Sequence, residues 1–145
     1  MQIVSLFIFL LAQLFNGQEK ADLVIEIDNV QSTSGVLWVG VYSSAETFLD
    51  KDKAILKRVE INHPGTVSLY VSDLSYGDDY AIAVLHDLNN NGDLDRNFFG
   101  IPTEPFAFSG QIYSSWRAPR FDEVKFRFDP THNALRLQLK EWWDF

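Results

Sequence analysis

Along most of the chain, hydrophobic and polar residues alternate one by one, which is the spacing of a β-strand with one buried face. Turn-forming residues such as Ser34-Gly35 and His63-Pro64-Gly65 separate these segments. Short strands with regularly spaced turns predict an all-β fold, an antiparallel β-sandwich of the immunoglobulin-like or prealbumin-like kind with seven to eight strands. The expected strands cover residues 23–28, 37–42, 55–61, 67–72, 80–86, 124–128 and 135–140.

Three local patterns refine this picture. Residues 80–86 are apolar at nearly every position, which is typical of a central strand covered on both faces. The segment from Leu74 through Gly77 to Tyr80 has the pattern of a tyrosine corner, in which the phenol bonds to upstream backbone. The Ser43-x-x-Glu46 spacing is a capping box and predicts one short helical turn near residues 44–50.

The N-terminus carries an apolar run over residues 3–15, broken only by Ser5 and Gln13. A bilayer-spanning helix needs about 20 apolar residues, whereas a run of this length fits the core of a signal peptide. We therefore predict a signal peptide at 1–17 and a single β-sandwich domain at 18–145. The protein would be exported to the periplasm or the cell exterior, with no membrane insertion after cleavage. The alternative is that the run forms a buried strand or helix.

Composition narrows the classes of partner. The chain has 145 residues, with 12 Lys and Arg against 20 Asp and Glu, so its formal net charge is −8. This balance excludes a nucleic-acid partner and docking on an anionic membrane, because both need clustered positive charge. The chain has no cysteine, which excludes disulfides, thiolate metal sites and cysteine nucleophiles. What remains is an acidic, aromatic-rich globular domain.

The stretch between residues 85 and 109 has little strand pattern, and long irregular segments in compact domains are usually functional. Within it, residues 87–95 follow the first nine positions of a calcium loop, with oxygen side chains at positions 1, 3, 5 and 9 and Gly92 at the sharp turn. Hard carboxylate and amide oxygens suit Ca²⁺. The candidate ligands are Asp87, Asn89, Asn91, Asp95 and the backbone carbonyl of Asp93, with Glu104 as a further candidate.

The calcium pattern is incomplete. Phe98 stands at position 12, where calcium loops carry a bidentate glutamate, so the expected Kd is about 10⁻⁴–10⁻³ M, as in extracellular modules. The alternative is an Asn/Asp/Gly-rich turn whose side chains bond their own backbone without a metal.

The same stretch carries a family resemblance. It reads His86-Asp87-x-Asn89-x-Asn91-Gly92-x-Leu94-Asp95-x-Asn97-x-x-Gly100-x-Pro102-x-Glu104, followed by Phe108-Ser109. This pattern resembles the bacterial DUF2141 family of uncharacterised exported proteins. The resemblance implies export and an immunoglobulin-like or prealbumin-like sandwich, and it implies no particular reaction. One departure is Leu88, which stands where the family usually has an acidic residue.

The sequence leaves three functions open. We favour a non-enzymatic binding or structural module, with an unidentified protein or glycan as ligand, because no nucleophile elbow or other recognisable catalytic motif is present. A hydrolase-type site around His86, Asp87 and Glu104 is one alternative, although a His at a strand end is more often hydrogen-bonded within the fold. Carbohydrate binding through exposed aromatics is another, with Trp116 as the best contact candidate, whereas Trp38 is expected to pack inside.

Overall fold

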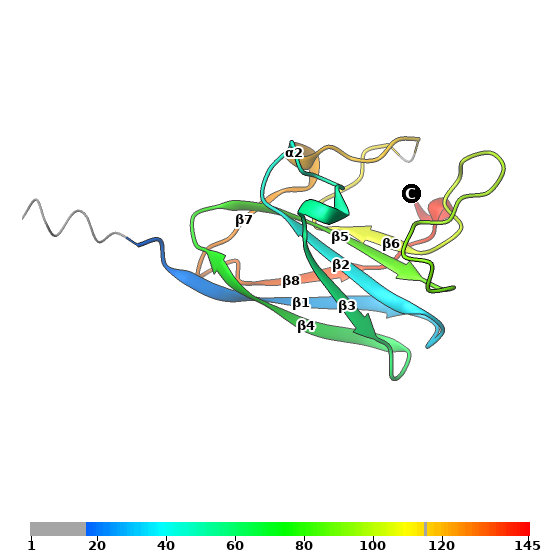
Figure 1. Ribbon diagram of the computed structural model, residues 1–145, viewed down its shortest axis with the longest axis horizontal. Helices are drawn as coiled ribbons and strands as arrows, with labels where there is room; N and C mark the ends of the chain where they lie inside the picture. The colour runs from blue at the N-terminus through cyan, green and yellow to red at the C-terminus, as the bar shows by residue number, and fades with distance from the viewer. Residues whose placement is uncertain (1–16, 115) are drawn as a thin grey trace, which may run out of the picture.

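The fold was analysed in a computed structural model, which describes residues 17–114 and 116–145. All but the last residue of the predicted signal peptide lies outside the described residues. The described chain forms two β-sheets that pack face to face (Figure 1). The strands are β1 (Lys20–Val30), β2 (Val36–Tyr42), β3 (Ile55–Glu60), β4 (Gly65–Ser75), β5 (Asp79–Asp87), β6 (Phe106–Phe108), β7 (Phe126–Arg127) and β8 (Ala134–Gln138).

One sheet has the order β4-β1-β8 and the other the order β3-β2-β5-β6, with β7 pairing to β5. The prediction of an all-β fold built from two sheets is confirmed. The expected antiparallel pairing holds for every named pair except one, because β8 runs parallel to β1, with Leu135 opposite Ile25. The assignment as immunoglobulin-like or prealbumin-like stays a prediction.

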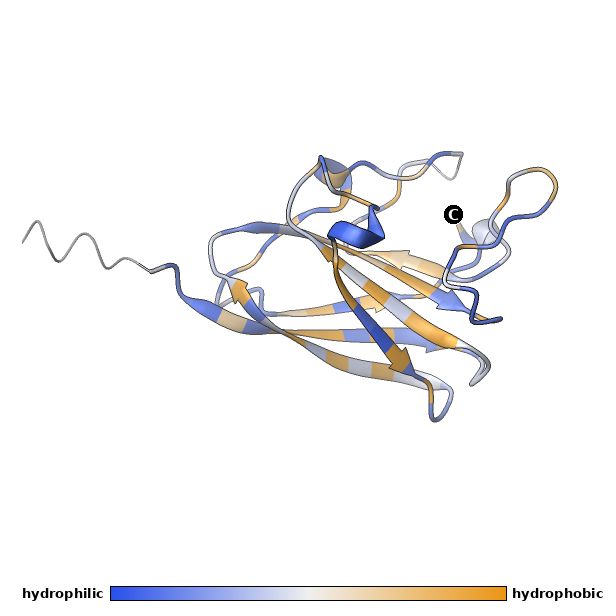
Figure 2. Ribbon diagram, in the orientation of Figure 1, coloured by the Kyte–Doolittle hydropathy of each residue, from blue (hydrophilic) through white to orange (hydrophobic). Residues whose placement is uncertain are grey.

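The core between the sheets follows from the alternation in the sequence. Leu23, Ile25 and Ile27 on β1 are fully buried, and they face Leu37 and Val39 on β2, which are buried to the same degree. The intervening residues of β1 are more polar and less buried, and Figure 2 shows the resulting banding of the strands. Burial of one face of each sheet supplies the main hydrophobic stabilisation of the fold.

The predicted tyrosine corner is confirmed. Tyr80 Oη accepts a hydrogen bond from the backbone N–H of Ser75 at 3.1 Å, and the Tyr80 ring is 6% exposed and packs against Phe128. The bond closes the connection between β4 and β5, because it supplies an acceptor for an N–H at the end of a strand.

We expect Tyr80→Phe to lower the free energy of unfolding by about 1 kcal/mol, because it leaves the Ser75 N–H without this acceptor and preserves the ring packing. Urea unfolding followed by circular dichroism measures the difference. Tyr70→Phe on β4 is the matched control, since the Tyr70 ring is 65% exposed. Equal losses in the two variants would contradict the role assigned to the Tyr80 hydroxyl.

A smaller cluster covers part of the outer face of the five-stranded sheet. Its buried members are Tyr42 and Ala81 on the sheet and Phe121 and Val124 on the short helix α2 (Phe121–Val124). This explains why residues 80–86 are apolar on both faces: one face belongs to the main core, and the other lies partly under this cluster. The predicted strand at 124–128 is therefore wrong at its start, because Glu123 accepts the backbone N–H of Arg120 at 2.7 Å and begins a helical turn instead.

Two further differences concern short elements. The predicted helical turn near 44–50 is a hydrogen-bonded turn over 45–49, followed by the 3-10 helix η2 (Lys51–Lys53), and Asp50 accepts the N–H of Asp52 at the start of η2. A second 3-10 helix, η3, spans Trp142–Asp144. Strand β6 was not predicted, because three residues are too few to show alternation. Within the described residues, no helix is both long and apolar enough to cross a membrane.

Candidate functional site

The irregular segment 88–105 links β5 to β6 and lies at the end of the sandwich that also holds the C-terminus (Figure 1). Its first anchor is Asp87, the last residue of β5, whose side chain is fully buried. The Asp87 carboxylate accepts hydrogen bonds from the Trp38 indole N–H at 3.0 Å, from the Gly92 N–H at 2.8 Å and from the Asn91 N–H at 3.1 Å. Asp87 therefore fixes the loop to strand β2.

These bonds decide the ionisation of Asp87. Burial alone would raise the pKa of its carboxyl, because the charged form loses water. The hydrogen bonds from Gly92, from the Trp38 indole and from Asn91 outweigh burial and hold the pKa below its ordinary value of 3.8. Asp87 is thus a buried carboxylate that is fully charged at neutral pH.

Glu104 is the second anchor of the segment and is 4% exposed. One of its carboxylate oxygens accepts the N–H of Leu88 at 2.8 Å, and the other accepts the N–H of Asp95 at 3.0 Å. A single side chain therefore ties together the two ends of the 87–95 loop. Glu104 thus lies at the loop and orders its backbone, and its role as a further metal ligand stays a prediction.

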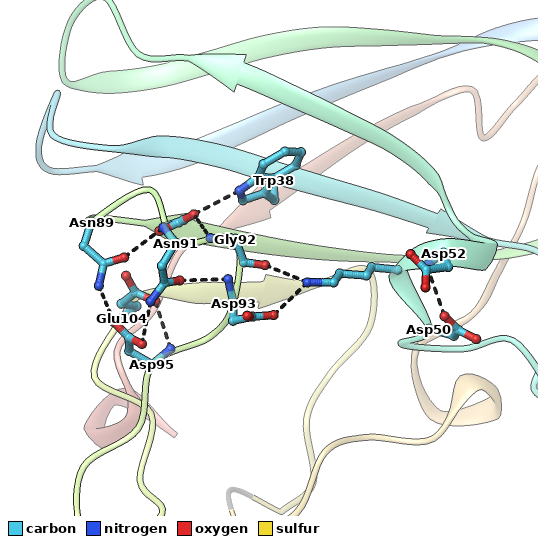
Figure 3. Close-up of polar contacts among 11 residues, drawn as sticks. Trp38, Asp50, Asp52, Asn89, Asn91, Gly92, Asp93, Asp95 and Glu104 are labelled. Carbon is cyan, nitrogen blue, oxygen red and sulfur yellow. Dashed lines mark hydrogen bonds and ion pairs between the residues drawn. The ribbon is translucent and has the colours of Figure 1, made fainter.

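The other predicted side chains form one network, which Figure 3 shows. The Asp95 carboxylate accepts from the side-chain amides of Asn89, at 2.5 Å, and Asn91, at 2.8 Å, while Asn89 Oδ1 accepts the Asn91 N–H at 3.1 Å. Asp93 points elsewhere, because its carboxylate pairs with Lys51 Nζ at 2.8 Å. The structure thus gathers four of the five predicted residues by their side chains. Among the described residues, no three His, Asp or Glu side chains are grouped so as to hold a metal alone.

The arrangement gives no support to a hydrolytic site around His86, Asp87 and Glu104. His86 is 1% exposed on the core face of β5, and its Nε2 lies 2.9 Å from the Ser34 carbonyl. A carbonyl only accepts, so this nitrogen carries the proton and donates. The three residues are buried and engaged in structural hydrogen bonds, and none of them lines the neighbouring groove. The prediction that His86 is hydrogen-bonded at a strand end is confirmed.

A groove of about 680 Å³ lies on the outer face of the five-stranded sheet. Strands β2, β5 and β6 form its floor, and the 92–102 segment and η2 contribute to its walls. Residues 112, 114 and 116–118 and the C-terminal residues complete the walls. The aromatic side chains that line this groove, the aromatic groove below, are Trp38, Tyr42, Phe99, Phe106, Phe108, Trp116, Trp142 and Phe145.

Several of these rings are exposed to solvent. Trp116 is 84% exposed and Phe99 is 82% exposed, and Trp116 meets Trp142 edge to face with ring centroids 5.5 Å apart. Trp116 therefore lines the groove with an exposed ring, and its role as a ligand contact stays a prediction. Trp38 is partly buried and lines the groove, so the expectation that it packs inside is only half right. Phe99 was missed, because alternation shows that a strand has two faces and does not show what gathers above the second face.

A comparison with known protein families shows to which family the chain belongs. The family described as "Uncharacterized protein conserved in bacteria (DUF2141)" matches residues 25–136, which is more than three quarters of the chain. The chain belongs to the DUF2141 family. The match includes both anchors of the loop and most of the aromatic groove, while Trp142 and Phe145 lie beyond the matched residues. No curated protein and no solved structure matches this DUF2141 chain.

Proposed function

We propose that this DUF2141 protein is an exported, non-catalytic binding module that holds a small ligand in the aromatic groove. The supporting observation is the groove itself, whose volume of about 680 Å³ and aromatic lining match the usual properties of small-molecule sites. Exposed rings such as Trp116 and Phe99 would lose unfavourable contact with water when a ligand covers them. The apolar N-terminal run supports export.

The proposal predicts that a neutral apolar dye such as Nile red binds the protein and brightens. Trp116→Ala should weaken dye binding about tenfold, because a large aromatic contact is lost. Trp143→Ala is the matched control: Trp143 is 68% exposed and does not line the groove, so its removal should leave the affinity unchanged. Fluorescence titration measures both affinities. The proposal would be contradicted if the dye did not bind, or if Trp116→Ala left its affinity unchanged.

A second element of the proposed function is a Ca²⁺ ion bound by the 87–95 loop, which forms part of the groove wall. The specific support is that Asp87, Asn89, Asn91 and Asp95 already belong to one network, whereas the Asp93 side chain points to Lys51. A calcium loop uses the same division, with side chains at positions 1, 3, 5 and 9 and a carbonyl at position 7. To bind the ion, the Asn89 and Asn91 amides would have to present oxygen in place of nitrogen.

We expect Ca²⁺ at tenfold excess over its Kd to stabilise the protein by about 1.4 kcal/mol, a rise of about 5 °C in the melting temperature. Asp95→Asn should abolish this rise, because it removes a charged ligand. Asp93→Asn should preserve it, because only the Asp93 carbonyl is used. Differential scanning calorimetry with CaCl2 and with EDTA makes the comparison. An unchanged melting temperature at 10 mM Ca²⁺ would reject the metal and leave the groove proposal standing.

A further inference from the structure

The aromatic groove differs from the rest of the molecule in charge. Its charged lining residues are Lys51, Arg96 and Arg117 against Asp52 and Asp93, which gives +3 − 2 = +1. The whole chain carries −8. Glu123 does not line the groove but pairs with Arg117, and counting it brings the local sum to zero, so the groove lacks the negative charge that would repel an anionic ligand elsewhere on this protein.

The three cations are not equally available. Lys51 Nζ is held by Asp93 at 2.8 Å and also donates to the Gly92 carbonyl at 3.3 Å. Arg117 forms a two-point pair with Glu123, at 2.7 and 2.8 Å. Within residues 17–114 and 116–145, Arg96 makes no ion pair, and one of its guanidinium nitrogens donates to the Gly100 carbonyl at 3.0 Å. Arg96 therefore has donors left for a ligand.

The position of Arg96 is fixed by the backbone around it. Residues Arg96 and Pro102 form a β-bridge at the base of a tight turn, which is closed by hydrogen bonds from the Asn97 N–H to the Ile101 carbonyl and from the Gly100 N–H to the Asn97 carbonyl, both at 2.9 Å. The hydrogen bond from the Arg96 guanidinium to the Gly100 carbonyl lies within the same turn. A guanidinium held in this way loses less conformational entropy when it binds a carboxylate.

The remaining lining favours an apolar ligand body over a sugar. Recognition of hydroxyl groups needs several directed hydrogen bonds, and three polar side chains of the groove are already engaged: Trp38 Nε1 donates to Asp87, Lys51 pairs with Asp93, and Arg117 pairs with Glu123. In contrast, the Trp116, Trp142 and Phe99 rings offer flat apolar surfaces at the rim. Aromatic and ring-shaped apolar bodies stack on such surfaces.

We propose that the ligand of the aromatic groove is a small organic anion, with a flat apolar body between the aromatic side chains and a carboxylate paired to the Arg96 guanidinium. This inference rests on the proposed binding function of the groove and adds the chemical class of the ligand. Guanidinium and carboxylate match in geometry, so the pair can form two parallel hydrogen bonds.

Two probes of nearly equal shape separate the contribution of the negative charge to affinity from that of the apolar body. They are 2-naphthoate and its neutral analogue 2-naphthamide. Titration followed by tryptophan fluorescence should show that 2-naphthoate binds the wild-type protein about tenfold more tightly, and that the difference shrinks at high salt. Arg96→Gln should remove the preference and leave 2-naphthamide affinity unchanged, whereas Arg96→Lys should keep part of it. Lys51→Gln and Arg117→Gln are the matched controls, and both should retain the preference for the anion.

The possible failures can be told apart. If neither probe binds, or if Trp116→Ala leaves the affinity for both probes unchanged, the groove is not a binding site. Both the proposed binding function and the proposed ligand class are then wrong. If both probes bind equally and lose affinity in Trp116→Ala, the groove function stands and the anionic ligand class is wrong. A preference for 2-naphthoate that survives Arg96→Gln would overturn the role of Arg96.

Discussion

Replacing Gly35 with alanine is expected to destabilise the protein by about 4 kcal/mol or more, enough to prevent folding if the wild type is of ordinary stability. A Cβ atom on Gly35 would lie 1.9 Å from the Asp87 carbonyl oxygen and 2.7 Å from the Leu88 Cα. Both atoms belong to the backbone, so no rotation of a side chain relieves the clash. The paired ends of β2 and β5, and with them the first residues of the loop, would have to move apart.

The Gly35 substitution also meets a conformational cost, since its φ of +73° lies in the left-handed region. Gly100→Ala isolates that cost, because Gly100 has a φ of +78° and nothing lies within 4 Å of an added Cβ. We expect Gly100→Ala to cost about 1 kcal/mol. Urea unfolding followed by circular dichroism measures both variants. If the two alanine variants were equally stable, the inferred clash between a Cβ at position 35 and the backbone of Asp87 would be contradicted.

Replacing Asp87 with alanine is expected to cost about 3 kcal/mol. The substitution removes the acceptor of the Trp38 indole N–H and of the Gly92 and Asn91 backbone N–H groups, and it does so at a fully buried position. Asp87→Asn should be nearly as damaging, because the new amide presents a donor to groups that are themselves donors. Asp93→Ala is the matched control and should change stability only slightly, since the Asp93 side chain is 72% exposed in its pair with Lys51.

Asp87 also predicts a dependence on pH. The pKa of its carboxyl is lower in the folded protein than its ordinary value of 3.8, because the hydrogen bonds outweigh the effect of burial. The stability that this group contributes is therefore complete only well above the unfolded pKa of 3.8 and is lost as the pH falls through the lowered pKa. Wild-type stability should fall more steeply with acid than that of Asp87→Ala. Parallel pH profiles of the two proteins would contradict this role for the Asp87 carboxylate.

Much of the fold can be predicted from the sequence because the relevant patterns are local. Alternation along β1 and β2 places their buried residues correctly, since successive side chains of a strand point to opposite faces. The tyrosine corner joins residues five positions apart, and the contacts of Asp87 with Asn91 and Gly92 span four and five positions. Patterns of this kind are visible in any short stretch of chain.

Other features were not predictable because they join distant segments. The parallel pairing of β8 with β1 brings together residues more than a hundred positions apart, and one Glu26 carboxylate oxygen accepts hydrogen bonds from two guanidinium nitrogens of Arg136. The short helix α2 takes the first residue of an expected strand, because Phe121 and Val124, three positions apart, share the helix face that packs with Ala81, while Phe126 begins β7.

Most of the strands, the turn-forming loop at 87–95 and the family are predictable from the sequence, whereas β6 and the helical start of the 124–128 segment are not. The burial of His86 and Glu104, and the gathering of aromatic rings from five separate segments along one groove beside Arg96, are visible only in the folded structure. The physical reason is that alternation reports the difference between the two faces of a sheet. What covers each face depends on the packing of remote segments, and the groove exists where the five-stranded sheet is left uncovered.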